Sequence, residues 1–217
     1  MGLDMYLNKA KRIDNATIHQ IAAIDKYYSW LERGEEYKYY SMERYCGTDI
    51  SEVDMNLAAK YKSEYIRRYS YWDTDKEYGY NAIFQNIAYW RKANQIHSWF
   101  VKNVQSNEDD CGSYDVTKEQ LEKLLDVCEK VKASSELVDG MVINGYTLSG
   151  PCYKSGKVIK NPEVAIELLP TQSGFFFGNT DYNEWYLEDI EDTIKLLKRI
   201  LKETDFDNWI VFYHSSW

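Results

Sequence analysis

The chain lacks the short motifs that most often identify an enzyme's chemistry. It has no Gly-x-x-x-x-Gly-Lys-Ser/Thr phosphate loop, no His-Glu-x-x-His metal motif, no Gly-x-Gly-x-x-Gly fingerprint and no nucleophile elbow. Its four cysteines are widely spaced, with no Cys-x-x-Cys pair and no histidine at zinc-ligand spacing. Sequence support for an enzyme is therefore weak, and we predict no catalytic residues, no metal and no cofactor.

Long hydrophobic runs are also missing. No stretch approaches the length of a membrane span. The opening MGLDMYLNKAKRID carries an acid at Asp4 and no long apolar segment, so it does not match a secretory signal. We therefore predict a cytoplasmic protein with reduced thiols.

Positive charge is scarce relative to negative charge. The chain has 35 acidic and 26 basic residues, for a net charge of −9. Because phosphate contacts drive the affinity of duplex-binding proteins, this balance argues against duplex nucleic acid as a partner. An acidic, aromatic-rich surface could imitate nucleic acid, but the same charge is also enough to keep a small protein soluble.

Aromatic residues are abundant, at 16% of the chain, and 20 of them are tyrosines. A Tyr ring buries apolar area while its hydroxyl needs a partner or water, so tyrosines collect at contact surfaces and at core edges alike. Two segments are especially dense, Ile87 to Val104 and Leu168 to Tyr186. They indicate either a contact face or an aromatic core with polar edges.

Hydrophobic periodicity predicts an α+β fold, with about five helices packed on a small, mainly antiparallel sheet that includes the N- and C-terminal strands. Thr117 and Gln120 form a capping-box pattern ahead of one helix, and Cys128 falls on the apolar stripe of that helix, as a small buried hydrophobe would. The expected elements are a strand at Leu3–Leu7, helices from about Asn15 to Gly34, from Ser51 onward, from Ala82 to Val104 and from Thr117 onward, strands at Val164–Leu169 and Phe175–Phe177, a helix starting at Asp181 or Asn183, and a strand at Trp209–Tyr213.

The length and composition require no split into independent domains. We predict a single domain over residues 1–217, with surface excursions at 35–50, 69–81 and 138–162. The second excursion is rich in aromatic and turn-forming residues, and loops of that length are often functional. We therefore expect it to supply a partner-binding surface, formed by Tyr69, Tyr71, Trp72, Tyr78 and Tyr80.

A candidate ligand site lies on the expected helix from Ala82 to Val104. Helical spacing would put Arg91, Asn94, Gln95 and Ser98 on one flank, with His97 beside them. An Arg with amides and a His could cradle an anionic or nucleotide ligand, since Arg offers a bidentate fork and amides bind polar edges. The alternative is an ordinary polar helix face with a hydrogen-bonded core histidine.

The second aromatic segment could complete this site. A helix N-terminus flanked by hydroxyls and glycines can hold an anion, but Asp181 and Glu184 would repel one. Glu184 could also bind metal or act as a base, although carboxylates in a first turn are more often caps. The predicted ligand-binding residues are Trp90, Arg91, Asn94, His97, Gln172, Ser173 and Trp185.

The opening MGLDMYL, the block YWRKANQIHSWFVKNVQ, the acidic DDC and the block LPTQSGFFFGNTDYNEWYLEDI together resemble a family of small uncharacterised proteins of bacteriophages and bacterial genomes. The resemblance covers about half of the chain and leaves out Tyr28 to Tyr80. It implies a phage or mobile-element setting, in which small accessory proteins often counter host immunity by sequestering a nucleotide signal or binding a defence protein.

The leading hypothesis is therefore a phage-encoded accessory protein in the host cytoplasm that counters defence without catalysis. It would bind a nucleotide-derived small molecule or a host defence protein. One alternative is a nucleotide-processing hydrolase or transferase, with His97 as acid or base and carboxylates from Asp109, Asp110 or Glu184. Another is a structural or regulatory protein that forms homo-oligomers through its aromatic patches.

Overall fold

A computed structural model describes residues 2–33, 50–62, 83–148 and 150–217. Its architecture is α+β, and the sequence-based prediction of the fold class is confirmed, with six α-helices in the described residues and both terminal strands in a mainly antiparallel sheet. In chain order the elements are β1 (Asp4–Lys11), α1 (Ile18–Arg33), the 3-10 helix η1 (Ile50–Glu52), α3 (Met55–Lys60), β2 (Phe84–Arg91), α4 (Asn94–Asn103), β3 (Ser113–Val116), α5 (Lys118–Ser134), β4 (Leu137–Thr147), β5 (Gly150–Ile159), α6 (Glu163–Leu168), α7 (Glu184–Glu203) and β6 (Trp209–Ser216).

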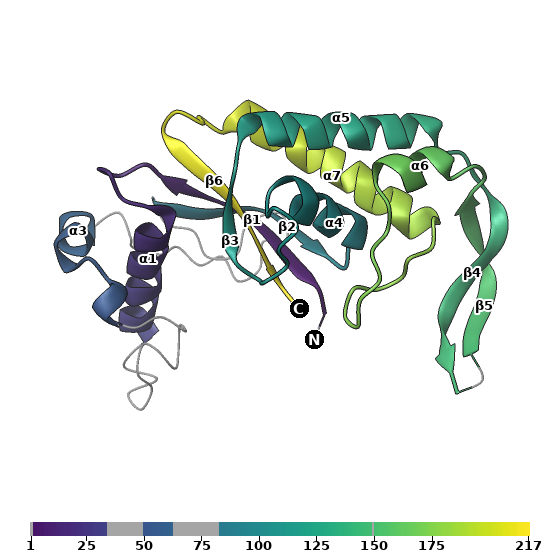
Figure 1. The fold of residues 1–217 in the computed structure, drawn as a ribbon, viewed down its shortest axis with the longest axis horizontal. Helices are drawn as coiled ribbons and strands as arrows, with labels where there is room; N and C mark the ends of the chain where they lie inside the picture. Colours follow the sequence, from purple (N-terminus) through teal and green to yellow (C-terminus); the bar gives the residue numbers. More distant parts are fainter. Residues whose placement is uncertain (1, 34–49, 63–82, 149) are drawn as a thin grey trace. The chain divides into compact units, whose positions relative to one another are not determined.

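The main sheet has four strands in the order β2-β1-β6-β3. At one end of β1, Lys11 N donates to Ile83 O over 2.8 Å, and at the other end Lys92 N donates to Leu3 O over 2.8 Å. Since the partner numbers fall as the β1 numbers rise, β1 and β2 are antiparallel. The N-terminal and C-terminal strands are neighbours, and Figure 1 shows the two chain ends close together.

The expected helix from Ala82 to Val104 is wrong in its first half. Residues Phe84–Arg91 form β2, and only Asn94–Asn103 is helical. The two elements are separated by Lys92 and Ala93, and the φ of 62° at Lys92 ends the strand. Aromatic and β-branched residues favour a strand once a neighbouring strand offers hydrogen bonds, and here pairing with β1 overrides the helical spacing of the apolar residues.

Two short expected strands are also wrong. The segment expected as a strand at Val164–Leu169 contains helix α6, which follows Pro162, a residue suited to a helix start. The segment Phe175–Phe177 is a turn, closed by Phe177 N donating to Gly174 O over 3.2 Å. A Cβ at Gly174 would lie 2.6 Å from the Phe177 ring, so only glycine allows this turn to fold so tightly.

The internal contacts divide the chain into two compact units. Unit 1 comprises Met1–Leu7, Ala88–Thr204 and Phe212–Trp217, and unit 2 comprises Asn8–Ile87 and Asp205–Val211. Within unit 2, the Tyr28 hydroxyl donates to Ala58 O over 2.7 Å and Lys60 pairs with Asp14 over 2.9 Å, which connects α1 and the preceding turn to α3.

Helices α5 and α7 lie side by side in unit 1 (Figure 1). The predicted capping box of Thr117 and Gln120 is confirmed at the start of α5, and Asn183 caps α7. Apolar positions on both helices are buried between them and the rest of the unit: Leu121, Leu124, Cys128, Val131, Ile190, Ile194, Leu197 and Ile200. Burial raises the pKa of the Cys128 thiol to about 12, as expected for a cysteine that serves as a hydrophobe.

Strands β4 and β5 form an antiparallel hairpin, on which the expected excursion at 138–162 falls. Val142 faces the unit and is fully buried, while its neighbours Met141 and Ile143 are on the opposite face. The hairpin register shifts between Ile143 and Gly145, where a bulge interrupts the pairing.

Several predicted surfaces lie outside the described residues. They include the excursion at 69–81 with its five aromatic residues, and residues 35–49 of the first excursion. Among the helices that are described, none has the length and apolar character needed to cross a membrane.

Candidate functional site

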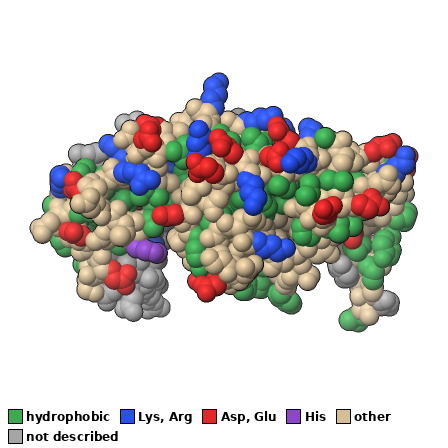
Figure 2. Space-filling view, turned by 45° about the horizontal axis from the view of Figure 1, so that its top comes forward, with side chains coloured by type: hydrophobic (Ala, Val, Ile, Leu, Met, Phe, Trp, Pro, Cys, Tyr) green, Lys and Arg blue, Asp and Glu red, His purple; other side chains and the backbone are tan. Residues whose placement is uncertain are grey.

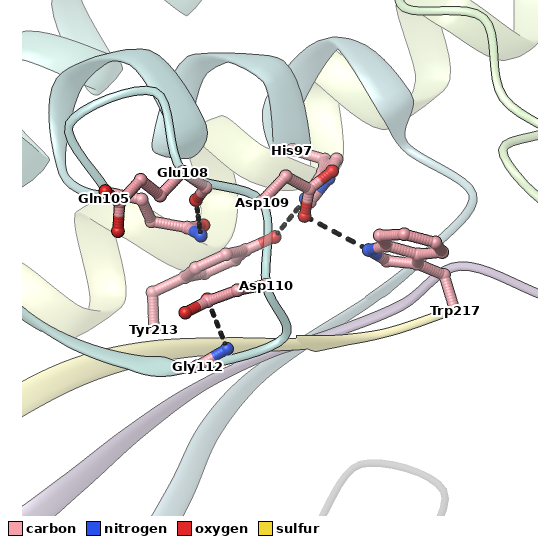
Figure 3. A network of polar contacts seen from close by, with 8 residues as sticks. All are labelled: His97, Gln105, Glu108, Asp109, Asp110, Gly112, Tyr213 and Trp217. Carbon is pink, nitrogen blue, oxygen red and sulfur yellow. Dashed lines mark hydrogen bonds and ion pairs between the residues drawn. The ribbon is translucent and has the colours of Figure 1, made fainter.

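His97 is the centre of a buried polar network in unit 1. It sits on α4 with no exposed surface. Its Nδ1 lies 2.8 Å from the Tyr213 hydroxyl on β6, and its Nε2 lies 3.0 Å from Oδ2 of Asp109. Figure 3 shows the three side chains converging from the helix, the strand and the loop that follows α4. Both ring nitrogens are therefore occupied by side chains of the protein.

Aromatic rings close the remaining sides of this network. The indole of Trp217 donates from Nε1 to the second oxygen of Asp109 over 3.1 Å (Figure 3). The Phe177 ring meets the His97 ring edge-on, with centroids 5.1 Å apart, and it also lies 5.8 Å from the Trp217 ring. The half-buried Asp109 and the exposed Trp217 are thus the outer members of a chain of contacts that leads inward to His97.

The protonation of this network follows from its partners. Burial, together with the negative charge of Asp109, raises the pKa of Tyr213 well above its ordinary value, so Tyr213 keeps its proton. A carboxylate only accepts hydrogen bonds, which assigns the His97 proton to Nε2 and leaves Nδ1 to accept from the Tyr213 hydroxyl. A histidine oriented by a carboxylate has the form of a general base, but the nitrogen that would take a proton already has a partner.

Asn94, at the start of α4, holds the loop before α7. Its amide nitrogen donates to Phe177 O over 3.1 Å and to Asn179 O over 2.8 Å, and its oxygen accepts from Gln172 N over 2.9 Å. The residue is buried. Three backbone groups of the loop are thereby satisfied by one side chain, which gives Asn94 a positioning role.

Trp90 and Gln95 contact the inner side of α7. The Trp90 indole donates to the Thr193 hydroxyl over 2.9 Å, and the Gln95 amide donates to Asp189 over 3.0 Å. Burial raises the pKa of Asp189 to about 6, although the hydrogen bond from Gln95 opposes that rise. Trp90, a predicted ligand residue, and its neighbour Gln95 therefore stabilise the packing of α7.

Arg91 lies on the opposite side of β2 from Trp90, because successive residues of a strand alternate between faces. Its Nε is 4.0 Å from the Asp4 carboxylate, which also accepts a hydrogen bond from the Tyr89 hydroxyl. Burial, and then that bond, raises the pKa of Tyr89 to about 12. The predicted flank of Arg91 with Asn94 and Ser98 does not exist, since Arg91 is not on the helix.

The remaining predicted ligand residues are at the surface. Ser173 is exposed, Gln172 is half-buried, and Trp185 is exposed by 39% with Lys154 Nζ 5.2 Å from its ring centroid. The structure therefore separates the seven predicted residues into a buried set, Trp90, Asn94 and His97, and a surface set, Arg91, Gln172, Ser173 and Trp185.

A hollow of about 330 Å³ opens beside the glycine-bracketed phenylalanines. It is lined by Lys92, Ile143, Gly145, Phe175, Phe176, Gly178 and Asn179, and it is called the Phe175 hollow below. Gly178 has a φ of 88°, and a Cβ there would come within 3.1 Å of Lys92 Cβ. Glycine at this position lets the loop approach Lys92 closely while keeping a left-handed conformation.

Large apolar side chains are exposed around this hollow. Phe175 is 94% exposed, and Met141 and Tyr153 on the hairpin are exposed by 59% and 58%. Tyr153 is the cross-strand partner of Ile143, so the two share the face of the hairpin that also carries Met141. Figure 2 shows hydrophobic side chains gathered along the protruding hairpin at its right-hand edge.

Sequence reasoning missed Lys92, Ile143, Phe175 and Phe176 as surface residues of one site. The available signal was the phenylalanine triplet itself. A two-residue alternation buries at most every second side chain, so three consecutive phenylalanines between glycines cannot all be core residues of a half-buried strand. Ile143 carried no comparable signal, because its position depends on how the hairpin packs.

The alternative enzyme hypothesis named His97 together with Asp109 and Asp110, and one of these two contacts is present. His97 and Asp109 are brought together, whereas Asp110 turns away and accepts from Gly112 N over 2.8 Å (Figure 3). In the part of the chain that the structure describes, no cluster of three or more His, Cys, Asp or Glu side chains could hold a metal ion. None of the family models, curated proteins or solved structures compared with the chain matches it.

Proposed function

We propose that this chain is a phage or mobile-element accessory protein that counters host defence, in the host cytoplasm, by binding a defence component without catalysis. The resemblance of its two aromatic blocks to small phage proteins supports the setting. The observation that carries the binding role is the Phe175 hollow, an open hollow of mixed polar and apolar lining whose wall includes a 94% exposed phenylalanine. Of the two partner classes, a protein is favoured over a nucleotide.

Exposed aromatic side chains next to a hollow are typical of interaction surfaces. Burying a large side chain such as Phe in an interface contributes about 1.5–3 kcal/mol, and a few such residues usually dominate the binding energy. Phe175 lines the hollow, and the exposed Met141 and Tyr153 share a hairpin face with Ile143, which also lines it. A protein partner with complementary apolar groups would use Phe175, Met141 and Tyr153.

A nucleotide pocket built on the predicted ligand residues has less support. Trp90, Asn94 and His97 are buried and have hydrogen-bond partners inside the protein. A base cannot stack on a ring that is already packed, and each existing hydrogen bond would have to be broken to make a new one. Arg91 and Trp185 remain available at the surface.

The test is protection of an infecting phage in bacteria that carry a defence system, with this protein expressed from a plasmid. Phe175→Asp should abolish protection, while Ile166→Asp, which changes a 50% exposed isoleucine of α6, should leave it intact. Equal expression and equal melting temperatures are required of both variants. Full protection with Phe175→Asp would exclude the Phe175 hollow as the contact.

The second candidate, a nucleotide-processing enzyme, is supported by the 3.0 Å contact of His97 with Asp109. Purified protein is incubated with mono-, di- and cyclic nucleotides and NAD-derived molecules, and its thermal unfolding is measured. Each mixture is then analysed by mass spectrometry. A ligand at about a hundred times its dissociation constant adds roughly 2.7 kcal/mol to the free energy of unfolding. A ligand recovered chemically changed, with loss of turnover in Asp109→Asn, would establish catalysis.

A further inference from the structure

Among the residues that the structure describes, strand β4 of the hairpin has one edge without a backbone partner. Strands β4 and β5 form a sheet of two, so β4 pairs with β5 along one edge only. None of the backbone hydrogen bonds among the described residues outside that pairing involves β4 between Val138 and Tyr146. An unpaired edge presents a row of N–H and C=O groups that can accept a further strand.

This edge belongs to the same site as the exposed Phe175 and the half-buried Phe176. Ile143 and Gly145 of β4 line the Phe175 hollow together with Phe175 and Phe176. The register shift between Ile143 and Gly145 bends β4 here, and nothing lies within 4 Å of where a Gly145 Cβ would be. A strand added to β4 would therefore run past an open hollow that Ile143, Phe175 and Phe176 line together with Lys92 and Asn179.

The charge at the hollow is of one sign. Lys92 is the single cation among the lining residues, and none of them is acidic, although the whole chain carries −9. Within the described residues, the Lys92 ammonium makes no ion pair. Its φ of 62° is an uncommon backbone conformation for lysine, held by Lys92 N donating to Leu3 O and Lys92 O accepting from Asn94 N.

We propose that an extended segment of the partner protein adds as a strand to the free edge of β4, places an apolar side chain in the Phe175 hollow and a carboxylate on Lys92. The inference rests on the proposed function and specifies its partner. Main-chain hydrogen bonds to β4 contribute affinity, and the hollow and Lys92 make binding specific for the sequence of the partner segment.

A second copy of this chain fits the site less well. Its β4 contains one acidic residue, Asp139, which already pairs with Lys157 over 3.0 Å in its own hairpin. Pairing β4 with β4 would therefore offer Lys92 no unpaired carboxylate from the added strand. A partner segment with its own Asp or Glu next to a large apolar residue does offer one.

The probes are fluorescent peptides about eight residues long, close to the usual strand length. The acidic peptide alternates Val and Thr and carries a central Trp-Thr-Asp, and a matched peptide has Lys in place of that Asp. Fluorescence anisotropy at low salt should show the acidic peptide binding about tenfold more tightly than the Lys peptide. Lys92→Glu should reverse this preference, and Lys102→Glu, an exposed lysine of α4, should preserve it.

Strand addition is tested by changing the backbone of the peptide, while the protein stays unchanged. N-methylation removes backbone donors, so methylating alternate residues on one edge of the acidic peptide should weaken binding at least about tenfold, and methylating the other edge should leave it unchanged. Phe175→Ala should weaken all binding of the unmethylated peptide.

Several results would overturn the inference. They are equal affinity for the acidic and Lys peptides, no effect of methylation on either edge, or no binding of the acidic peptide up to about 1 mM. A stable dimer in sedimentation that Ile143→Asp dissociates would assign the edge to a second copy instead. If peptides fail while Phe175→Asp still abolishes phage protection, the proposed function stands without this mode of binding.

Discussion

The Asp109 carboxylate lies 3.0 Å from Nε2 of the fully buried His97, and its second oxygen accepts from the Trp217 indole. Asp109→Ala leaves the buried His97 N–H without a partner, which should lower the free energy of unfolding by about 1–3 kcal/mol. Urea denaturation measures the loss. Asp126→Ala, which removes an exposed i,i+4 pair with Lys130, should change stability by less than about 0.5 kcal/mol.

Asn94 satisfies three backbone groups of the loop that carries the phenylalanines. Asn94→Ala should destabilise the protein by about 2–4 kcal/mol, because each lost contact leaves a buried or half-buried backbone group unpaired. Hydrogen exchange at the Gln172 amide should accelerate as well. The exposed Asn56→Ala serves as the control. Unchanged exchange at Gln172 would show that the loop holds its position without Asn94.

Asp189 should make stability depend on pH. Its folded pKa of about 6 exceeds the ordinary 3.8, so the folded state binds the proton more tightly, and the stabilising contribution is present below about pH 4 and is lost as pH rises through 6. Asp189→Asn keeps an oxygen that accepts from Gln95 and removes the buried charge. At pH 7 the free energy of unfolding of this variant should therefore exceed that of the natural protein by about 1–3 kcal/mol. Urea denaturation at pH 4 should show little difference. Parallel stability curves of the two proteins would contradict the raised pKa.

Gly178 has a φ of 88° and lies against Lys92. Gly178→Ala should cost about 1–2 kcal/mol, because an L side chain is strained in this conformation and its Cβ would come within 3.1 Å of Lys92 Cβ. Gly2→Ala is the matched control, since its Cβ would meet only the flexible side chains of Lys92, at 3.3 Å from Cε, and of Arg91, at 3.7 Å. Thermal unfolding of both variants measures the difference. Equal melting temperatures would mean that the loop shifts without cost.

Much of the helical architecture could be predicted from local signals. The capping box of Thr117 and Gln120 and the apolar stripe of α5 act within a few residues of one another, and the structure has them as expected. Of the two starts expected for the last helix, Asp181 and Asn183, the structure has Asn183 as the cap. The prediction from local spacing was wrong in the first half of Ala82 to Val104. There the same apolar residues suit a helix or a strand, and the choice depended on β1, which is some 80 positions earlier in the chain.

The candidate site was less predictable than the fold. His97 was expected either in a ligand pocket or as a hydrogen-bonded core residue, and the decision came from Tyr213, 116 positions away. The Phe175 hollow joins β4, the turn at Phe175 and the end of β2, so no single stretch of sequence contains it. Side chains that meet only after folding leave no periodicity to detect.

The sequence alone determined what acts over short range: the α+β class, the capped helices, the buried Cys128 and the absence of familiar catalytic motifs, since each depends on residue type and local spacing. The tertiary structure alone decided which aromatic side chains became core and which stayed exposed. Trp90 and Phe177 are buried because other strands and helices cover them, and Phe175 remains 94% exposed because the tight turn at Gly174 directs it outward.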